Sequence, residues 1–280
     1  MKRFTETITD EQLQMILALG NGDSAYVGSS LAELRADVDD MDEFAFYSDS
    51  DREGDTVCLV ETYLRSGTPV HELWGPFGVH IHEMLETVIS DYSECEMLIS
   101  QRYFSLLDEY KNISLRVVND YHQFRNAKQS VNAPTKLAVN DAVEFEQLQF
   151  ALKPNVFAEL KQMHTEAFGK SDGLVAEISG KQTPAKIIVC VFNGSVVGYV
   201  VFDVNANLKK IELLYIVTKK SYRRHGFGSN LLKAVERHYV GYEIVLMQPV
   251  NHVAAYHFYL AQGFEMSGLY RHALVRNAML

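Results

Sequence analysis

Hydrophobic and polar positions divide the first 130 residues into short elements of two kinds. Apolar residues at helical spacing predict helices over residues 10–20, 29–36, 80–92 and 103–110. Runs rich in β-branched and aromatic residues predict strands over residues 44–47, 56–64, 70–77, 95–100 and 114–122. The acidic segment Asp37–Glu43, between a predicted helix and a predicted strand, is expected to be a loop.

The remaining residues repeat this order of elements. Helices are predicted over residues 154–168, 174–178, 229–239 and 254–262, and strands over 143–148, 186–192, 196–204, 209–217, 243–247 and 264–275. Asn193-Gly194 is typical of a two-residue hairpin turn. The polar, proline-containing stretch Asn126–Lys136 is the best candidate linker. The repeat predicts an α+β protein with two domains, residues 1–130 and 131–280.

Length and charge support the division into two domains. A chain of 280 residues exceeds one ordinary hydrophobic core, and 47% apolar and 22% charged residues exclude disordered, collagen-like and disulfide-scaffold classes. Residues 1–130 hold 24 acidic and 10 basic residues, a net charge of −14, whereas residues 131–280 hold 12 and 16, a net charge of +4. This contrast indicates two units with different tasks and argues against a nucleic-acid-binding protein.

Targeting signals, cysteines and metal ligands add further expectations. No signal or transit pattern follows Met1, and no apolar window of about 18 residues exists, so we expect a cytoplasmic protein without a membrane partner. The three separated cysteines, Cys58, Cys95 and Cys190, predict buried free thiols. The sequence His80-x-His82-Glu83 has no third ligand at a useful spacing, so a helix start is favoured and no metal is expected.

The segment Arg223–Ser229 is the best candidate for chemistry. It lies between a predicted strand and a predicted helix, and its glycines at 226 and 228 allow successive N–H groups to point at one spot. Lys219, Lys220, Arg223 and Arg224 add positive charge, and the helix start adds its dipole. This arrangement suits a pyrophosphate; the alternative is a glycine-rich turn with solvated cations. Antiparallel strands before the loop disfavour a Rossmann oxidoreductase or a P-loop.

With this element order, residues 209–264 resemble the core of a GNAT-superfamily N-acetyltransferase. The family pattern is arginine or glutamine, two residues, glycine, one residue, then glycine or alanine, and Arg223, Gly226 and Gly228 match it. Asn251 and the run from Tyr259 to Gly263-Phe264 match a second motif of the family. The resemblance covers about residues 135–280 and implies a mostly antiparallel mixed sheet flanked by helices.

Residues 1–130 resemble the same family in element order only. Their equivalent loop, Gly75–His80, lacks an arginine or glutamine at the right offset, and Pro76 removes one N–H group. No Tyr-x-x-x-Gly-Phe motif follows it. The resemblance therefore implies a tandem protein with a degenerate N-terminal copy that does not bind acetyl-CoA in the family's manner.

For residues 131–280, the resemblance implies acetyl transfer from acetyl-CoA to an amine by direct attack. The residues expected to bind acetyl-CoA are those of the loop, the preceding strand end and the second motif: Ile216, Val217, Thr218, Arg223, Arg224, His225, Gly226, Phe227, Gly228, Ser229 and Asn251. Tyr259 is the candidate general acid, since an ordinary tyrosine pKa of about 10 is close to that of a thiol; the alternative is a tyrosine at the core edge.

Glu212 is the candidate general base, because the resemblance places base glutamates on this strand. Strand alternation predicts that Glu212 shares a face with Leu214, Ile216 and Thr218, and the alternative is an exposed glutamate beside Lys210. Tyr256 and His257 are weaker candidates. The expected acceptor is a small-molecule amine, and the −14 half raises the hypothesis that it is cationic. A non-catalytic CoA-binding or protein-interaction module is the alternative function, and the oligomeric state does not follow from the sequence.

Overall fold

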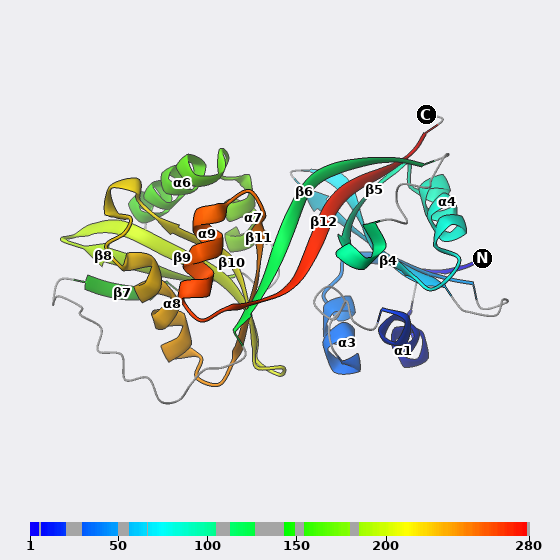
Figure 1. Cartoon of the computed structure of the whole chain (residues 1–280), viewed down its shortest axis with the longest axis horizontal. Helices are drawn as coiled ribbons and strands as arrows, with labels where there is room; N and C mark the ends of the chain where they lie inside the picture. Colours follow the sequence, from blue (N-terminus) through cyan, green and yellow to red (C-terminus); the bar gives the residue numbers. More distant parts are fainter. Residues whose placement is uncertain are drawn as a thin grey trace. The chain divides into compact units, whose positions relative to one another are not determined.

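The chain forms two compact units in a computed structural model, which describes residues 1–5, 7–20, 30–49, 56–65, 67–104, 113–126, 143–148, 154–179 and 185–278. The first unit comprises Met1–Gln123, Gln248–Val253 and Ser267–Leu280. The second comprises Phe124–Met247 and Ala254–Met266. Each unit is a mixed sheet with helices against it, so the predicted α+β fold is confirmed (Figure 1).

The sheet of the first unit has the strand order β1-β2-β3-β4-β5-β12-β6. Its neighbours are antiparallel from β1 to β4 and between β5 and β12, whereas β4 and β5 are parallel. The elements are β1 (Lys2–Phe4), α1 (Asp10–Leu19), α3 (Leu31–Asp39), β2 (Glu43–Ser48), β3 (Val57–Arg65), β4 (Thr68–Phe77), α4 (Ile81–Asp91), β5 (Glu94–Ser100), the 3₁₀ turn η1 (Gln101–Tyr103), β6 (Ile113–Asn126) and most of β12 (Glu265–Asn277).

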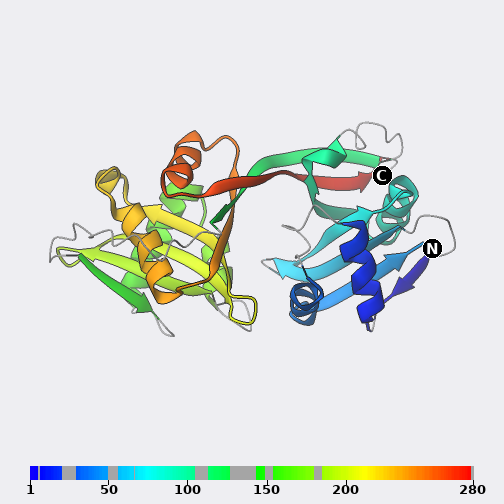
Figure 2. The same ribbon diagram turned by 60° about the horizontal axis from the view of Figure 1, so that its bottom comes forward.

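Apolar side chains on the two faces of this sheet explain where its helices lie. Leu13 and Ile16 of α1 and Leu34 of α3 are buried in one cluster with residues of β2, β3 and β4. Met84 and Val88 of α4 are buried in a second cluster with alternate residues of the same strands and of β5 and β12. Figure 2 shows α1 in front of the strands of this unit.

Three expectations for this part of the chain change. Asp37–Glu43 is not all loop, because α3 continues to Asp39 and buries Val38 four residues after Leu34. Of the helix expected over 103–110, the structure describes Tyr103 at the end of η1 and Phe104 after it, and the rest lies outside the described residues. Asn126 of the expected linker ends β6, and the rest of that linker is likewise outside them.

The second unit contains β7 to β11 in the order β7-β8-β9-β10-β11, antiparallel except for the parallel pair β10 and β11. Its elements are β7 (Val143–Leu148), α6 (Pro154–Phe168), α7 (Asp172–Ser179), β8 (Lys186–Phe192), β9 (Ser195–Asn205), β10 (Lys210–Thr218), the 3₁₀ turn η2 (Lys220–Tyr222), α8 (Phe227–His238), β11 (Glu243–Pro249) and α9 (Val253–Ala261). Asn193 and Gly194 have φ angles of 50° and 75°, so the predicted hairpin turn is present.

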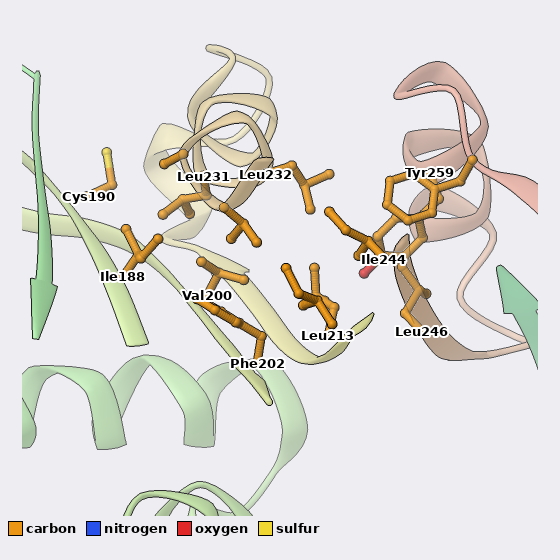
Figure 3. Close-up of a cluster of buried hydrophobic side chains, with 14 of the residues drawn as sticks. Ile188, Cys190, Val200, Phe202, Leu213, Leu231, Leu232, Ile244, Leu246 and Tyr259 are labelled. Carbon is orange, nitrogen blue, oxygen red and sulfur yellow. The ribbon is translucent and has the colours of Figure 1, made fainter. Parts of the chain in front are cut away.

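Two apolar layers sandwich this second sheet. Leu160 and Met163 of α6 and Leu174 of α7 are buried with Tyr199 and Val217 on one face, which we call the α6/α7 face. On the other face, the α8/α9 face, residues of α8 and α9 pack against β8 to β11. Figure 3 shows the α8/α9 face, with Leu231, Leu232 and Tyr259 above side chains that include Ile188, Val200, Phe202, Leu213, Ile244 and Leu246.

The C-terminal strand changes the composition of the units. Residues Tyr270–Arg276 of β12 pair antiparallel with Ser100–Glu94 of β5, inside the first unit. Conversely, Phe124 and the residues that follow it belong to the second unit. The compact units therefore differ from the predicted domains 1–130 and 131–280 in three segments, residues 124–130, 248–253 and 267–280.

The cysteines agree with the sequence interpretation. Cys58, Cys95 and Cys190 are buried free thiols. Burial raises the pKa of Cys95 to about 12 and that of Cys190 to about 11, so both thiols stay protonated at neutral pH. In the described part of the chain, no helix is both long and apolar enough to span a membrane.

Candidate active site

The strands β10 and β11 of the second unit are paired at one end only. Their parallel pairs run from Lys210 with Glu243 to Glu212 with Val245, and no further pair is recorded in these two fully described strands. β10 also has a bulge, because Leu213 pairs with Phe202 and Tyr215 with the adjacent Val201 of β9. A bulge bends and twists its strand. The remaining residues of β10 therefore form an edge with no recorded ladder pair on the side of the strand that faces β11.

The loop at the end of this edge leads into α8. Arg224 and Gly226 have φ angles of 67° and 85°, and Gly226 is the N-cap of α8 without a side-chain capping bond. The first amides of a helix have no partner within it, so these amides are open to an external acceptor. Arg223, Arg224 and His225 are exposed around them. Backbone amides, helix dipole and cationic side chains together form a cradle that suits a pyrophosphate.

Three hydrogen bonds fix the shape of this cradle. The Lys219 amide donates to the Val197 carbonyl at 2.8 Å, and Arg223 Nε donates to the Thr218 carbonyl at 3.2 Å. His225 Nδ1 lies 2.8 Å from the Arg223 carbonyl oxygen. Thus Arg223, predicted to contact the anion, also attaches the loop to the end of β10.

The two glycine positions of the motif differ in whether the fold itself requires glycine there. Gly226 has a left-handed φ, which other residues adopt only with strain. A Cβ at Gly228 would lie 3.4 Å from the Phe258 ring and 3.7 Å from Thr218 Oγ1, which is ordinary van der Waals contact. Packing within the protein therefore does not require glycine at 228, whereas close approach of a ligand to the backbone would.

The structure groups most, but not all, of the predicted binding residues. Helix α8 begins at Phe227, so Phe227 and Gly228 are helical rather than loop residues; the Phe227 ring is buried and packs 5.5 Å from Phe192. Ile216 packs on the α8/α9 face, and Val217 is buried on the α6/α7 face. Asn251 is exposed and belongs to the segment Gln248–Val253 of the first unit.

Tyr259 lies within the core of the α8/α9 face. Its ring centroid is 5.6 Å from those of Phe124 and Phe264, and the side chain is 6% exposed. Figure 3 shows Tyr259 projecting from α9 toward Ile244 and Leu246 of β11. Burial raises the pKa of Tyr259 well above its ordinary value. The argument from an ordinary tyrosine pKa is therefore wrong: Tyr259 retains its proton more strongly and is a weaker acid than expected.

The two weaker candidates on α9 differ in exposure. Tyr256 is partly buried, with its ring centroid 5.5 Å from that of Phe124, and His257 is exposed. Both therefore lie near Tyr259 along α9, but only Tyr256 packs against the same phenylalanine.

Glu212 is exposed, but it lies on a different face from the one predicted. Before the bulge, Ile211 and Leu213 pack on the α8/α9 face, so Glu212 faces the α6/α7 side. After the bulge, Leu214, Tyr215 and Val217 pack on the α6/α7 face, and Ile216 packs on the other. The expectation that Glu212 shares a face with Ile216 and Thr218 is therefore wrong, because the bulge at Leu214 interrupts the alternation.

A groove beside the cradle was missed from the sequence. It has a volume of about 530 Å³ and is lined by α6 and by the residues directly before the loop: Glu159, Gln162, Met163, Glu166, Lys219, Lys220 and Ser221. Lys219 Nζ lies 3.3 Å from Glu159 Oε2, and Gln162 Nε2 donates to Glu166 Oε1 at 2.9 Å. The groove has the size of a small-molecule site. Polar residues at helical spacing on α6 were the available signal.

The corresponding loop of the first unit is already occupied by a side chain. The buried Thr56 Oγ1 accepts hydrogen bonds from the amides of Val79 and His80, at 3.1 and 2.8 Å. These amides are at the β4–α4 junction, the place of the cradle in the second unit. An anion there would have to displace Thr56. Among the described residues, no cluster of three or more histidine, cysteine or carboxylate side chains is placed to hold a metal.

Comparisons with known proteins agree with this architecture. The model of the acetyltransferase (GNAT) family matches residues 154–264. No curated protein matches the chain in sequence. These comparisons place the family match on the unit that contains the cradle.

Three solved structures share the fold of nearly the whole chain. A GCN5-related N-acetyltransferase from Sphaerobacter thermophilus has a TM-score of 0.63 at 13% identity, covering 97% of this chain and 95% of its own. A tandem GNAT protein from the clavulanic acid biosynthesis pathway has a TM-score of 0.58 at 12% identity, covering 99% of both chains. A GNAT-family acetyltransferase from Colwellia psychrerythraea has a TM-score of 0.54 at 14% identity, covering 99% and 100%.

Proposed function

Because residues 154–264 belong to the acetyltransferase (GNAT) family, we propose that the second unit transfers the acetyl group of acetyl-CoA to a primary amine of a small molecule. The observation that carries the proposal is the half-open β10–β11 pair, which leads directly into the first amides of α8, where the N-cap Gly226 supplies no side-chain capping bond. Such an edge can pair with the amide-containing pantetheine arm, and the cradle can hold the pyrophosphate next to it.

The residues around the cradle fit acetyl-CoA. The amides of residues 224–229 would donate to the pyrophosphate, and the exposed Arg223 and Arg224 would supply full positive charge beside them. The backbone of Ile216, Val217 and Thr218 would bind the pantetheine arm, and an N–H group of this edge would donate to the thioester oxygen as charge develops there. One such donor typically contributes about 10²–10³ to the rate.

Two side chains remain candidates for proton transfer. Tyr259 would donate its proton to the sulfur as negative charge develops on it, and its raised pKa keeps the proton in place beforehand. Glu212 would accept a proton from the acceptor ammonium through water, from the α6/α7 side of the sheet. The nucleophilic amine would therefore approach on the side where α6 lines the groove.

The size of the groove suits a small acceptor, and the idea that the acceptor is cationic rests on the charge of the first 130 residues. Glu159 and Glu166 place two carboxylates on the α6 wall of the groove, close to Lys219 and Lys220. The net charge of −14 in residues 1–130 would raise the local concentration of a cation by long-range attraction. If kcat/KM for the preferred amine does not fall as ionic strength rises, charge steering is wrong.

Release of free CoA thiol from acetyl-CoA across a panel of amines tests the proposed function. We expect amine-dependent thiol release by the full chain. Tyr259→Phe keeps the ring packed against Phe124 and Phe264, so we expect kcat to fall by about 10²-fold or more with little change in the Kd for acetyl-CoA. Tyr239→Phe, which removes a tyrosine hydroxyl at the C-cap of α8 and keeps the ring packed on Phe202, is the matched control.

Two outcomes would contradict parts of this proposal. Tight acetyl-CoA binding without thiol release for any amine would identify a non-catalytic CoA-binding module. An unchanged kcat in Tyr259→Phe would remove Tyr259 from the reaction while leaving the acetyl transfer itself intact.

A further inference from the structure

A buried hydrogen bond lies in the otherwise apolar core of the α6/α7 face. His164 on α6 is 2% exposed, and its Nδ1 is 2.7 Å from the hydroxyl oxygen of Tyr199 on β9. Tyr199 is completely buried, and the residues clustered around it are apolar or aromatic. Burying two polar groups in such a core is unfavourable unless each satisfies the other.

The burial of Tyr199 determines the direction of this hydrogen bond. Among the residues that the structure describes, His164 is the one hydrogen-bond partner recorded for the Tyr199 hydroxyl. Leaving a buried O–H group without an acceptor costs about 1–3 kcal/mol, so the hydroxyl donates to Nδ1. Nδ1 must then be unprotonated, which assigns the neutral tautomer with hydrogen on Nε2 to His164.

The same imidazole packs against the strand that forms the open edge. The ring centroids of His164 and Tyr215 are 4.7 Å apart at 84°, and Phe168 packs 4.6 Å from His164 and 5.5 Å from Tyr215. Tyr215 directly follows the bulge at Leu214. Its hydroxyl reaches α7, where a Cβ at Gly173 would lie only 2.8 Å from it. The imidazole therefore holds Tyr215 between α6 and α7.

We propose that His164 is a positioning residue for acetyl transfer, which in its neutral form holds Tyr215 and thereby the opened edge of β10. The inference rests on the proposed function. Protonation of His164 would place an N–H group opposite the O–H group of Tyr199, and the hydroxyl would have to turn away and lose its acceptor. The ring would then shift from Tyr215, and the edge that aligns the thioester would lose its support.

The surroundings of His164 favour the neutral form near neutral pH. The titratable groups recorded against its ring are Tyr199 from β9 and Tyr215 from β10, and both are uncharged there. Of the described side chains of α7, Leu174 and Ile178 pack in this cluster, and Gly173 approaches the Tyr215 hydroxyl; none of the three carries a charge. Burial lowers the pKa of His164 below its ordinary value of 6.5, with no contribution from a charged neighbour. The protonated form therefore accumulates only in acid.

The test is the dependence of kcat on pH in His164→Gln. The glutamine Oε1 can accept the Tyr199 hydrogen bond and cannot become charged in this range. For the wild type we expect kcat to change little between about pH 7.5 and pH 6.5 and to fall at lower pH, reaching a decrease of about tenfold one pH unit below the midpoint of the decline. For His164→Gln we expect kcat near pH 7.5 within about fivefold of the wild type, and a decrease toward acid of less than about threefold.

A second variant and a control make the outcome decisive. Tyr199→Phe removes the opposing O–H group and keeps the ring, so the acid decrease should shrink there as well. His238→Gln alters an exposed histidine at the end of α8 and should retain the full decrease. An acid decrease of wild-type size in both His164→Gln and Tyr199→Phe would overturn the inference. Absence of acetyl transfer by the wild type near neutral pH would instead contradict the proposed function.

Discussion

Glu96 in the first unit accepts hydrogen bonds from side chains on two other strands. Arg65 on β3 contacts both of its carboxylate oxygens, at 2.7 and 3.0 Å, and His272 Nε2 on β12 lies 3.2 Å from one of them. The hydrogen bond from His272 and the guanidinium of Arg65 lower the pKa of Glu96 to about 2. By contrast, burial raises the pKa of Glu72, which pairs directly with Glu96 across β4 and β5.

The lowered pKa of Glu96 makes the stability of the first unit depend on pH. Because this pKa lies below the ordinary value of 4.5, the stabilisation is complete above that value and is lost as the pH falls toward about 2. We expect Glu96→Gln to lower the free energy of unfolding by roughly 1 kcal/mol near neutral pH, since Arg65 is half exposed and screened by solvent. The effect of the substitution should disappear at about pH 2.

Fluorescence of Trp74 can measure this effect in urea. Trp74 is the single tryptophan of the chain and belongs to the first unit. Glu86→Gln removes a carboxylate that contacts His82 on the exposed side of α4, and it serves as the control. Equal effects of both substitutions at every pH would contradict the assignment to Glu96.

At the scale of elements, the two glycines at the start of α8 show which position requires glycine for folding and which could require it for ligand binding. Gly226 is required by its left-handed φ, but the space around Gly228 accepts a methyl group. Gly228→Ala should leave the thermal stability unchanged or raise it by up to about 1 kcal/mol, because alanine favours the helix. If the amide of residue 228 contacts the pyrophosphate, the added Cβ should weaken acetyl-CoA binding by about tenfold or more.

Calorimetric titration with acetyl-CoA, together with thermal unfolding, checks this prediction. Lys233→Ala changes a side chain farther along α8, outside the predicted binding residues, and is the control, so its Kd should change little. Unchanged acetyl-CoA affinity in Gly228→Ala would show that the ligand does not approach the backbone there.

Elements with a strong local pattern were the ones that could be predicted from the sequence. The bounds of α6, β7 and β8 agree with the prediction, because helical spacing, the Asn193-Gly194 turn and β-branched runs act over a few residues. Helix α8 begins two residues earlier than expected, since Gly226 itself serves as the N-cap. Local signals therefore located the cradle but not the first residue of its helix.

Features that depend on distant residues were not predictable in the same way. The bulge at Leu214 exists only in the register of β10 against β9, and it moves Glu212 to the α6/α7 side. Thr56, directly before β3, accepts hydrogen bonds from the amides of Val79 and His80, which follow β4. The His164–Tyr199 bond joins a helix to a strand 35 residues away. Contacts between residues this far apart do not alter the hydrophobic periodicity of either segment, so neither segment alone predicts them.

For the whole molecule, the main finding is that the C-terminal strand β12 is part of the sheet of the first unit. Tyr270–Arg276 add a strand to β5, and Ala273 and Val275 are fully buried under α4 with residues of β2 and β3. Arg271 also forms an ion pair with Asp120 of β6, with nitrogen–oxygen distances of 2.9 and 3.1 Å. The first 130 residues therefore lack a central strand of their own sheet.

Truncation after Met266 tests whether the first unit folds without this strand. Removing residues 267–280 leaves the ladder groups of β5 without their partners and exposes the cluster beneath α4. We expect the Trp74 unfolding transition to move to lower urea concentration, corresponding to a loss of about 3 kcal/mol or more in the free energy of unfolding. The amides of residues 95–100 should then exchange rapidly. A chain shortened only after Asn277 keeps every pair of β12 with β5 and should match the full chain. If the chain ending at Met266 retains the same transition, residues 1–130 fold as an independent domain, as the sequence pattern predicts, and β12 merely adds to a completed sheet.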